Sequence, residues 1–373
     1  MELSKDKAIS WLTTRLGDVL KYEQPTKYIV NSTQYDDSFE TPVLTAGQSF
    51  LLGYTDEIDN VYEDLPVIIF DDFTTATKFV DFPFKVKSSA MKILKADKKV
   101  SDIKFLFYLL QTLNIDSEQH KRYWISKYAE LKIPLPNLET QKRIATILDE
   151  ADTLRQLNQQ LIAKYDALTQ SLFLDMFGDP VTNPKGWEKV KTIKYCTSIV
   201  PGRDKPKSFT GNIPWVTTAD LVHLGLTEKS EKSIGLTKSE ISEVRAKIIP
   251  IGSVIMTCVG DLGVITINKV PIIINQQLHA FQCNDKLNNV FLMYSLSFQK
   301  PYMYKMASST TVPYMNKTVS NNVPTIVPPI HLQTQFAERV QLIEQQKQQA
   351  QDALQKSELL FNGLLQKAFN GTL

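Results

Sequence analysis

Residues that build disulfide frameworks and metal sites are scarce in this sequence. Its 373 residues include three cysteines and four histidines, which are scattered and show neither C-x-x-C nor H-E-x-x-H spacing. Neither a disulfide framework nor a zinc site is therefore expected. All apolar runs are too short to cross a membrane, and the first residues, MELSKDK, lack the apolar core of a signal peptide. We expect a soluble, reduced, cytoplasmic protein without a membrane partner.

The sequence also lacks the motifs of common nucleotide-binding and DNA-modifying enzymes. No G-x-x-x-x-G-K-[ST] phosphate loop occurs, and no G-x-G-x-x-G follows a predicted strand. The Asn/Asp-Pro-Pro-aromatic tetrapeptide of amino-methylating enzymes is missing too, since residues 327–330 read VPPI. Residues 130–132, ELK, match part of a nuclease motif that is common by chance, and we interpret them as structural. We therefore expect a chain that is not an enzyme, with no catalytic residues and no metal site.

Residues 138–178 form the stretch around which the chain is organised. No proline or glycine occurs from Glu139 to Phe177, so nothing interrupts a helix of roughly 60 Å. Apolar residues recur at alternating steps of four and three in two overlapping series, which predicts a stripe facing a partner helix. Polar Arg155 and Asn158 at seam positions indicate a moderate coiled coil. The expected seam residues are Ile144, Leu148, Leu154, Leu161, Leu168 and Leu172.

Residues 330–370 repeat this pattern and supply the partner helix within the same chain. The offset is constant at 192 residues, as between Gln141 and Gln333 (333 − 141). Each copy follows a proline-containing apolar run, IPLPNL at 133–138 and IVPPI at 326–330. A long repeat of this kind decides the architecture of a chain. The expected seam residues of the second copy are Phe336, Val340, Ile343, Leu354, Phe361 and Leu364.

The globular parts repeat as well. VIIF at 67–70 corresponds to SVIMT at 253–257, and FLFYLLQTL at 105–113 corresponds to FLMYSLSF at 291–298. GDPVTNPKGW at 178–187 contains two prolines and two glycines, which indicates a domain boundary. We therefore predict a tandem duplication in the order domain, helix, domain, helix. Mixed α/β domains are expected at 1–137 and 179–329, and long helices at 138–178 and 330–373.

A lysine-rich stretch occurs in each globular part, although the formal net charge of +2 neither requires nor excludes nucleic acid. Lysine and arginine contact phosphates, and glutamine and threonine in loops contact base edges. The alternative interpretation is a solvated surface, and for Gln276 and Gln277 an ordinary strand with one side chain outward and one capping the backbone. The DNA-binding candidates are Thr75, Thr77, Lys78, Lys85, Lys87, Lys92, Arg203, Lys205, Lys207, Thr217, Thr218, Gln276 and Gln277.

Several stretches together resemble the specificity (S) subunits of type I restriction–modification systems. SLFLDMFGDPVTNPKGW at 171–187 is similar to the central conserved region of that family, as are IPLPNLETQKRIATIL at 133–148 and IVPPIHLQTQFAERV at 326–340. IPWVTTADL at 213–221 and the NQQ at 275–277 look like pieces of its target-recognition domains. The resemblance covers nearly the whole chain. FDDFTTATKF at 70–79 departs from the glycine-bearing loop of many relatives.

The resemblance implies an assembly. Two target-recognition domains would each read one half of a split sequence in double-stranded DNA. The two long helices would pack antiparallel as a spacer and dock two methyltransferase subunits, with restriction subunits joining through the complex. The resemblance implies no cofactor in this chain, and it places S-adenosylmethionine, ATP and Mg²⁺ on the partner subunits.

Two rival functions remain open from the sequence. One is a self-contained restriction–methylation enzyme, against which the full-length duplication and the missing methyltransferase motifs argue. The other is a scaffold that binds only protein through its helices; salt-dependent DNA binding by residues 203–207 would count against it.

Overall fold

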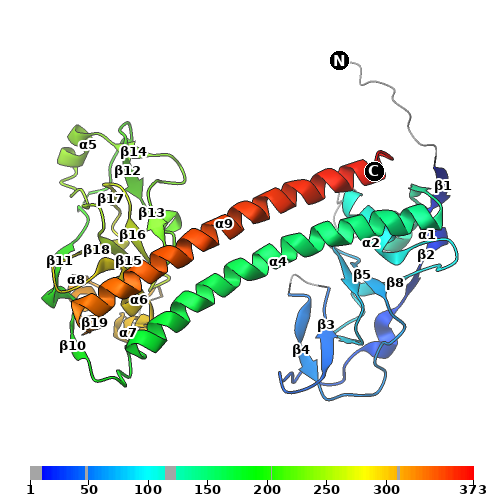
Figure 1. The fold of residues 1–373 in the computed structure, drawn as a ribbon, viewed down its shortest axis with the longest axis horizontal. Coiled ribbons are helices and arrows are strands. Elements are labelled where there is room, and N and C mark those ends of the chain that lie inside the picture. Colours follow the sequence, from blue (N-terminus) through cyan, green and yellow to red (C-terminus); the bar gives the residue numbers. More distant parts are fainter. Residues whose placement is uncertain (1–10, 47–48, 114–122, 203, 309–310) are drawn as a thin grey trace. The chain divides into compact units, whose positions relative to one another are not determined.

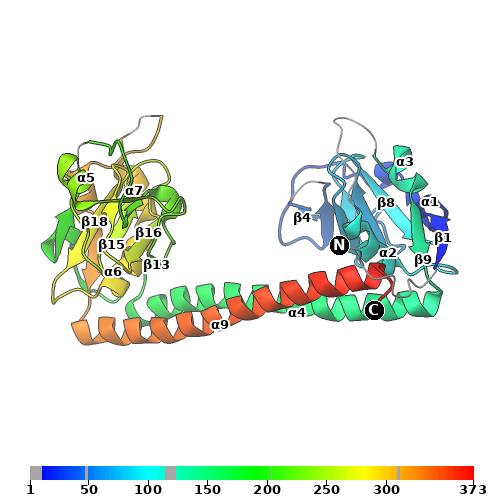
Figure 2. The ribbon, with the colours of Figure 1, turned by 90° about the horizontal axis from the view of Figure 1, so that it is seen from above.

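The computed structural model describes residues 11–46, 49–113, 123–202, 204–308 and 311–373. The chain divides into two compact units (Figure 1, Figure 2). Unit 1 comprises Met1–Gln159 together with Gln351–Leu373, and unit 2 comprises Gln160–Ala350. Each unit thus contains one globular part and about half of each long helix. Within the described part of the chain, no helix is both long and apolar enough to span a membrane.

In the described part of unit 1 the strands form three sheets. The largest has the strand order β2-β8-β5-β6 and is antiparallel; in the second, β4-β3-β7, strand β7 runs parallel to β3; in the third, β1 pairs with β9. The strands are β1 (Leu12–Arg15), β2 (Leu20–Glu23), β3 (Thr41–Leu44), β4 (Leu51–Thr55), β5 (Val67–Asp71), β6 (Thr77–Val80), β7 (Lys85–Val86), β8 (Met91–Ala96) and β9 (Lys132–Leu135). The short helices are α1 (Leu16–Val19), η1 (Pro25–Tyr28), α2 (Ile103–Thr112), α3 (Tyr123–Ser126) and η2 (Tyr128–Glu130).

Unit 2 repeats these three sheets with one extra strand. Their orders are β11-β18-β15-β16-β13, then β14-β12-β17 with β17 parallel to β12, then β10-β19. The strands are β10 (Glu188–Lys191), β11 (Cys196–Ile199), β12 (Ile213–Val216), β13 (Leu226–Thr227), β14 (Gly235–Leu236), β15 (Val254–Thr257), β16 (Ile265–Asn268), β17 (Ile273–Ile274), β18 (Leu278–Cys283) and β19 (Pro324–Val327). The short helices are η3 (Thr192–Lys194), η4 (Thr218–Asp220), α5 (Lys238–Glu243), α6 (Asn289–Ser297), α7 (Lys300–Met306) and α8 (Lys317–Asn321).

The matching strand orders confirm the tandem arrangement of mixed α/β domains. Strand β5 in unit 1 and strand β15 in unit 2 hold the same central place, as the VIIF and SVIMT repeats predicted. Helix α2 likewise corresponds to α6. A short, continuous apolar run is typical of a strand buried on both faces. In unit 1, Ile68 and Phe70 face one core while Val67 and Ile69 face the other.

The long helices belong to the cores of both units. In unit 1, Leu148 of α4 (Leu138–Phe177) and Phe361 of α9 (Ile330–Phe369) join the cluster that contains Phe105 of α2. In unit 2, Phe173 of α4 and Phe336 of α9 have ring centroids 5.4 Å apart and join the corresponding cluster. Because α4 contributes its first half to unit 1 and its second half to unit 2, and α9 the reverse, the two helices are antiparallel in each unit (Figure 1).

The two ends of α4 follow from its sequence. Asn137 caps the start, where its side chain accepts a hydrogen bond from the Thr140 N–H at 2.8 Å. Gly178 ends the helix with φ +76°, a conformation that glycine adopts without strain. A Cβ atom at Gly178 would also meet Pro184 Cγ at 2.8 Å, so the stop is fixed by packing as well as by conformation.

The predicted seam of α4 is wrong at three positions. Leu154, Leu161 and Leu168 are 46%, 39% and 49% exposed. Successive helical residues lie about 100° apart, so a register error of one residue moves a side chain off the interface. The seam runs through Arg155 and Asn158, the polar residues that the other of the two overlapping series places there. The remaining predicted seam residues are buried or half-buried, namely Ile144, Leu148, Leu172, Phe336, Val340, Ile343, Leu354, Phe361 and Leu364.

The polar seam residues find partners on α9. In unit 1 the Arg155 guanidinium lies over the Phe361 ring, 4.5 Å from its centroid, and Asn158 Nδ2 donates to Ser357 Oγ at 3.4 Å. A cation over an aromatic face is attractive and suits arginine. These contacts explain how a helix pair with polar residues at its seam positions still packs.

Candidate DNA interface

A pocket of about 440 Å³ in unit 2 brings several predicted residues together. It lies where β12 and β17 end, beside the chain that precedes β12. Four of the DNA-binding candidates line it, together with polar and aromatic neighbours that are not among those candidates. The candidates are Lys205, Thr217, Gln276 and Gln277; the neighbours include Phe209, Trp215, Asp220, Lys232 and Asn275.

One wall of this pocket is built on a buried carboxylate. Asp220 Oδ2 accepts hydrogen bonds from the Thr217 N–H at 2.7 Å and from the Thr217 hydroxyl at 2.8 Å. Its Oδ1 accepts from the Glu231 N–H at 2.7 Å. The carboxylate therefore fixes the turn after β12 against residues 230–231. Thr218 begins η4 in that turn and is half-buried.

The glutamines of the β17–β18 turn have unequal roles. Gln276 Nε2 donates to the carbonyls of Gly202 (3.2 Å) and Asp204 (3.4 Å), so it holds the neighbouring loop in place. Gln277 is exposed, and its Oε1 accepts from Asn275 Nδ2 at 3.1 Å. Both glutamines are exposed and line the pocket, but the described contacts tie only Gln276 to the neighbouring loop.

Hydrogen bonds anchor the described residues on both sides of Lys205 and Lys207. Lys205 and Lys207 are exposed, whereas Arg203 lies outside the described residues. Beyond the segment, Glu240 of α5 accepts hydrogen bonds from the Ser208 hydroxyl (2.6 Å) and the Thr210 N–H (3.1 Å). The hydrogen bond from Ser208, then that from the Thr237 backbone, lowers the pKa of Glu240 to about 2. An anchored loop presents its cations at small entropic cost.

In unit 1, a second pocket of about 380 Å³ lies at the β5–β6 turn, with Thr45, Asp71, Thr74 and Lys78 among its lining residues. Asp71 organises the turn, because its side chain accepts from the Phe73 N–H at 2.9 Å and from the Thr74 hydroxyl at 2.5 Å.

Thr75, Thr77, Lys78 and Lys87 keep accessible positions in unit 1. Thr75 adopts φ +63° at the tip of the turn, and its hydroxyl donates to the Thr74 carbonyl at 2.6 Å. Thr77 is half-buried at the start of β6. Lys78 is exposed with its ammonium 6.0 Å from the Phe50 ring centroid, and Lys87 is exposed after β7. These four residues can reach a ligand at the surface.

Lys85 and Lys92 do not fit the prediction that they contact phosphates. Their side chains are 2% and 4% exposed. Lys85 pairs with Glu57 at 3.2 Å and Lys92 with Asp72 at 3.3 Å. Buried charges are retained when they are paired, and neither ammonium is free to meet a phosphate. The structure assigns both lysines to the interior of unit 1, which corrects the expectation for them.

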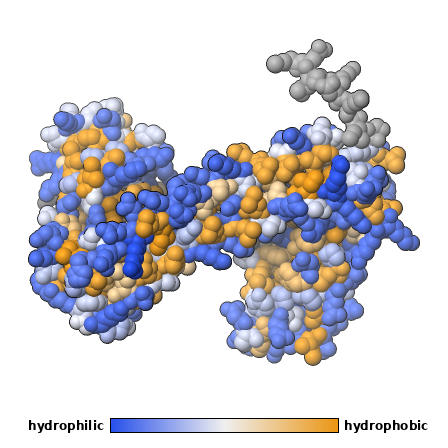
Figure 3. Space-filling model, viewed as in Figure 1, coloured by the Kyte–Doolittle hydropathy of each residue, from blue (hydrophilic) through white to orange (hydrophobic). Residues whose placement is uncertain are grey.

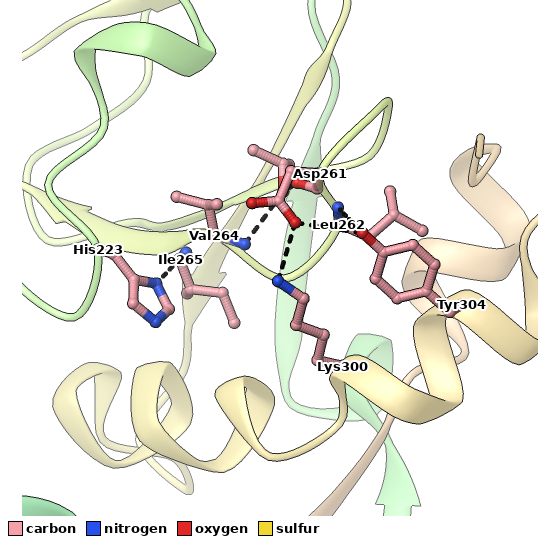
Figure 4. A network of polar contacts seen from close by, with 8 residues as sticks. His223, Asp261, Leu262, Val264, Ile265, Lys300 and Tyr304 are labelled. Atoms are coloured by element: carbon pink, nitrogen blue, oxygen red, sulfur yellow. Dashed lines mark hydrogen bonds and ion pairs between the residues drawn. The ribbon is translucent and has the colours of Figure 1, made fainter. Parts of the chain in front are cut away.

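The β15–β16 turn of unit 2 carries a polar network that sequence reasoning missed (Figure 4). Asp261 Oδ1 accepts from Lys300 Nζ at 2.8 Å and from the Tyr304 hydroxyl at 3.2 Å, and both donors come from α7. The hydrogen bond from Lys300 is the main cause that lowers the pKa of the Asp261 carboxyl. His223 Nδ1 accepts from the Ile265 N–H at 3.1 Å, and burial lowers the pKa of that imidazole. The turn contains Gly260 and Gly263, and its partners Lys300 and Tyr304 lie about forty residues further along the chain.

This network fixes the turn that corresponds to the β5–β6 turn of unit 1. Both turns join neighbouring antiparallel strands at matching places in the large sheet, yet one is built on Asp71 and threonines and the other on Asp261 and glycines. The scaffold is therefore shared while the loop chemistry differs. Among the residues that the structure describes, no group of three or more His, Cys, Asp or Glu side chains is placed to hold a metal ion.

The comparisons with known proteins agree on one family. The model of the "Type I restriction modification DNA specificity domain" matches residues 9–165 and 184–355. The Escherichia coli EcoR124I/EcoR124II type I restriction enzyme specificity subunit is 36% identical over 295 residues, which cover 73% of this chain and 70% of that protein. The Methanocaldococcus jannaschii MjaVIII specificity subunit is 23% identical over 367 residues, covering 90% of this chain and 86% of that protein.

Solved structures show the same fold. The S subunit of a type I restriction–modification system from M. genitalium has a TM-score of 0.60 at 16% identity, over 98% of both chains. A chain from a study of assembly and conformational transition of a type I restriction–modification system has a TM-score of 0.56 at 18% identity, over 99% of this chain and 100% of that one. With its two matched segments and its relative at 36% identity, this chain belongs to the type I restriction–modification DNA specificity family.

Proposed function

We propose that this chain is the DNA specificity subunit of a type I restriction–modification complex and that each unit reads one half of a bipartite DNA site. The observation that carries this proposal is the duplication with unequal loops. The two units share the order of their sheets and a common core with the long helices, but different polar residues line their pockets. Two globular parts with the same fold but different surface residues suit two half-sites of different sequence.

In unit 2 we assign phosphate contacts to the basic segment and base contacts to the pocket. Lys205 and Lys207 are exposed on an anchored loop, which suits backbone contacts that fix position without reading sequence. Gln277, with its exposed amide, can donate and accept at a base edge. Thr217 lines the pocket, and Thr218 follows it at the start of η4. Gln276 acts through the loop it supports.

In unit 1 we assign the DNA contacts to the β5–β6 turn and its pocket. Thr75 and Thr77 offer hydroxyls, which hydrogen-bond to bases or phosphates. Lys78 and Lys87 offer exposed ammonium groups for phosphates. Because Lys85 and Lys92 are buried and paired, they are not part of this surface.

The long helices supply a surface for partner subunits. Apolar surface is visible over them in Figure 3. Exposed apolar residues clustered in this way mark protein-interaction sites. The exposed large apolar residues are Leu154, Leu157, Leu161, Leu168 and Leu174 on α4 and Ile330, Leu342, Leu359 and Leu360 on α9. We propose that two methyltransferase subunits dock here, and that restriction subunits join through the complex.

Catalysis then falls to the partners. S-adenosylmethionine, ATP and Mg²⁺ would be bound by the methyltransferase and restriction subunits, and the target base would be flipped out by the methyltransferase. This chain would contribute recognition and spacing without a catalytic step of its own. Its place of action would be the cytoplasm, where the DNA lies.

Salt-dependent DNA binding by the assembled complex tests the proposal. Replacing Arg203, Lys205 and Lys207 with alanine should weaken binding to all sequences and reduce the slope of log affinity against log salt by about one unit per lost phosphate contact. Lys356→Ala, at an exposed position on α9, is the matched control and should leave the slope unchanged. If the triple variant keeps the full slope, these residues are only a solvated surface. If the unmodified complex shows no salt-dependent DNA binding at all, the protein-scaffold alternative replaces the proposal.

A further inference from the structure

The same buried glutamine occurs at the base of both long helices. Gln141, in the first turn of α4, and Gln333, in the first turn of α9, have no exposed surface. Polar side chains are rarely this deeply buried unless all their groups are hydrogen-bonded.

The hydrogen bonds of Gln141 join three segments of unit 1. Its Oε1 accepts from the Asp102 N–H at 2.9 Å, and Asp102 is the residue that caps α2. Its Nε2 donates to the Val100 carbonyl at 3.0 Å and to the Pro136 carbonyl at 2.8 Å. One side chain thereby ties α4 to the start of α2 and to the end of the segment that leaves β9.

Gln333 makes the corresponding bonds in unit 2. Its Oε1 accepts from the N–H of Asn288, which caps α6, at 2.9 Å. Its Nε2 donates to the Lys286 carbonyl at 3.3 Å and the Pro328 carbonyl at 2.7 Å. We call each glutamine with its three hydrogen-bond partners a joint. The three contacts of the Gln141 joint recur, atom for atom, in the Gln333 joint.

The two joints kept these contacts although the chain between the joined segments changed in length. Gln333 follows Gln141 by 192 residues (333 − 141), whereas Asn288 follows Asp102 by 186 (288 − 102). The segment from the helix cap to the glutamine is therefore six residues longer in unit 2 (333 − 288 = 45) than in unit 1 (141 − 102 = 39), yet the same contacts form. The retained geometry points to a requirement at the joint itself.

We propose that Gln141 and Gln333 are positioning residues that fix the angle between each globular part and its long helix, and thereby restrict the complex to one spacer length between the half-sites. This inference rests on the proposed function. Helix α2 packs on the large sheet that carries the β5–β6 turn, and α6 packs on the large sheet whose strand β18 follows Gln277. A bond that fixes the first residue of α2 or α6 to α4 or α9 therefore fixes the sheet, and the candidate contacts at its edge, as well. A tilt of about 10° over a lever of roughly 25 Å moves a reading turn by about 4 Å, close to the rise of one base pair.

The test uses Gln141→Met and Gln333→Met, singly and together, in the full chain co-expressed with its methyltransferase partners. Methionine has nearly the same length and shape but makes none of the three hydrogen bonds. Mapping methylated bases across the host genome gives the half-sites and the spacer lengths that each complex accepts. We expect unchanged half-sites, with methylation at spacers one base pair longer or shorter rising about tenfold relative to the normal spacer, the effect of losing about 1.4 kcal/mol of discrimination.

Two controls separate positioning from general destabilisation. Val340→Ala removes buried packing from α9 without touching either joint, so it should lower stability and leave the spacer unique. Hydrogen exchange at the Asp102 amide reports directly whether the joint has opened. If the methionine variants fail to fold, Gln141→Asn keeps the amide but is one methylene too short, and it serves instead.

The outcomes are distinct. A variant with an exchanging Asp102 amide and a spacer as sharply defined as that of the unmodified complex overturns the positioning role. A broadened spacer in Val340→Ala equal to that in the methionine variants also overturns it. If the unmodified complex shows no bipartite site with a fixed gap, the proposed function itself has failed.

Discussion

Matched insertions in the two long helices should change the distance between the half-sites. Helix α4 has 40 residues, and the boundary between the units falls at Gln159 on α4 and at Gln351 on α9. Four residues added after each of these positions leave the helix halves of both units paired as before. At 1.5 Å per residue the insertion adds about 6 Å, which equals one or two base pairs at about 3.4 Å each. The unread spacer should therefore lengthen by one or two base pairs.

The rotation that each insertion adds to the helices distinguishes a four-residue insertion from a seven-residue one. Four residues turn a helix by about 400°, a net rotation of about 40°, and one base pair turns DNA by about 35° in the same sense. Seven residues would add about 10.5 Å, the length of three base pairs, but a net rotation of about −20° against about +105° for the DNA. The seven-residue insertion keeps the heptad and should give the more stable protein. Its complex should nevertheless methylate poorly, because the rotation between its two globular parts no longer matches the rotation between the half-sites on DNA.

Methylome sequencing of cells that express each insertion variant with its partners gives the answer. The half-site sequences should stay the same, because no reading turn is altered. DNA bending can absorb part of the change at an energetic cost, so the four-residue variant should be slower than the unmodified complex. An active four-residue variant with the original spacer would refute the reasoning, as would a seven-residue variant that outperforms it.

Two further changes test the fold and its electrostatics. Leu148→Ala, in the buried seam of α4, should cost about 2–5 kcal/mol of unfolding free energy, whereas Leu154→Ala, exposed one turn and a half further on, should cost less than about 0.5 kcal/mol; equal losses in urea denaturation would contradict the seam described here. Burial, with a smaller contribution from Lys317, lowers the pKa of His279 to about 4 from the ordinary 6.5. Only the unfolded chain then takes up the proton between these values, so stability is complete above pH 6.5 and about 3 kcal/mol of it is lost as the pH falls toward 4. His279→Leu should flatten this dependence, and a curve of unchanged slope would show that another group is responsible.

The long-range organisation of this chain could be predicted because it rests on repeated local patterns. The helix of residues 138–178 and its copy are visible as uninterrupted heptads, and the VIIF run marks a strand whatever surrounds it. The exact seam could not be predicted in the same way. Leu154 and Arg155 belong to overlapping series one residue apart, and the choice between them depends on Phe361, which is about two hundred residues away in the chain.

The candidate site was predictable only in part, for a related reason. An exposed lysine and a buried, paired one look alike in a charge pattern, and Lys92 is distinguished from Lys87 only by its contact with Asp72. Likewise, Gln276 and Gln277 are neighbours in the sequence, yet hydrogen bonds to Gly202 and Asp204 make one of them structural. Contacts between distant segments decide such cases, and local patterns do not encode them.

The central claim is that each globular part reads one half of a bipartite DNA site independently of the other. Exchanging residues 12–130 for the equivalent part of a relative with a different target tests it most directly. This exchange leaves all of unit 2 unchanged, including the β10–β19 strand pair and the joint at Gln333. The account predicts that sequencing of methylated bases will show one new half-site, the other half-site preserved and the spacer retained. A simultaneous change in both half-sites would contradict it.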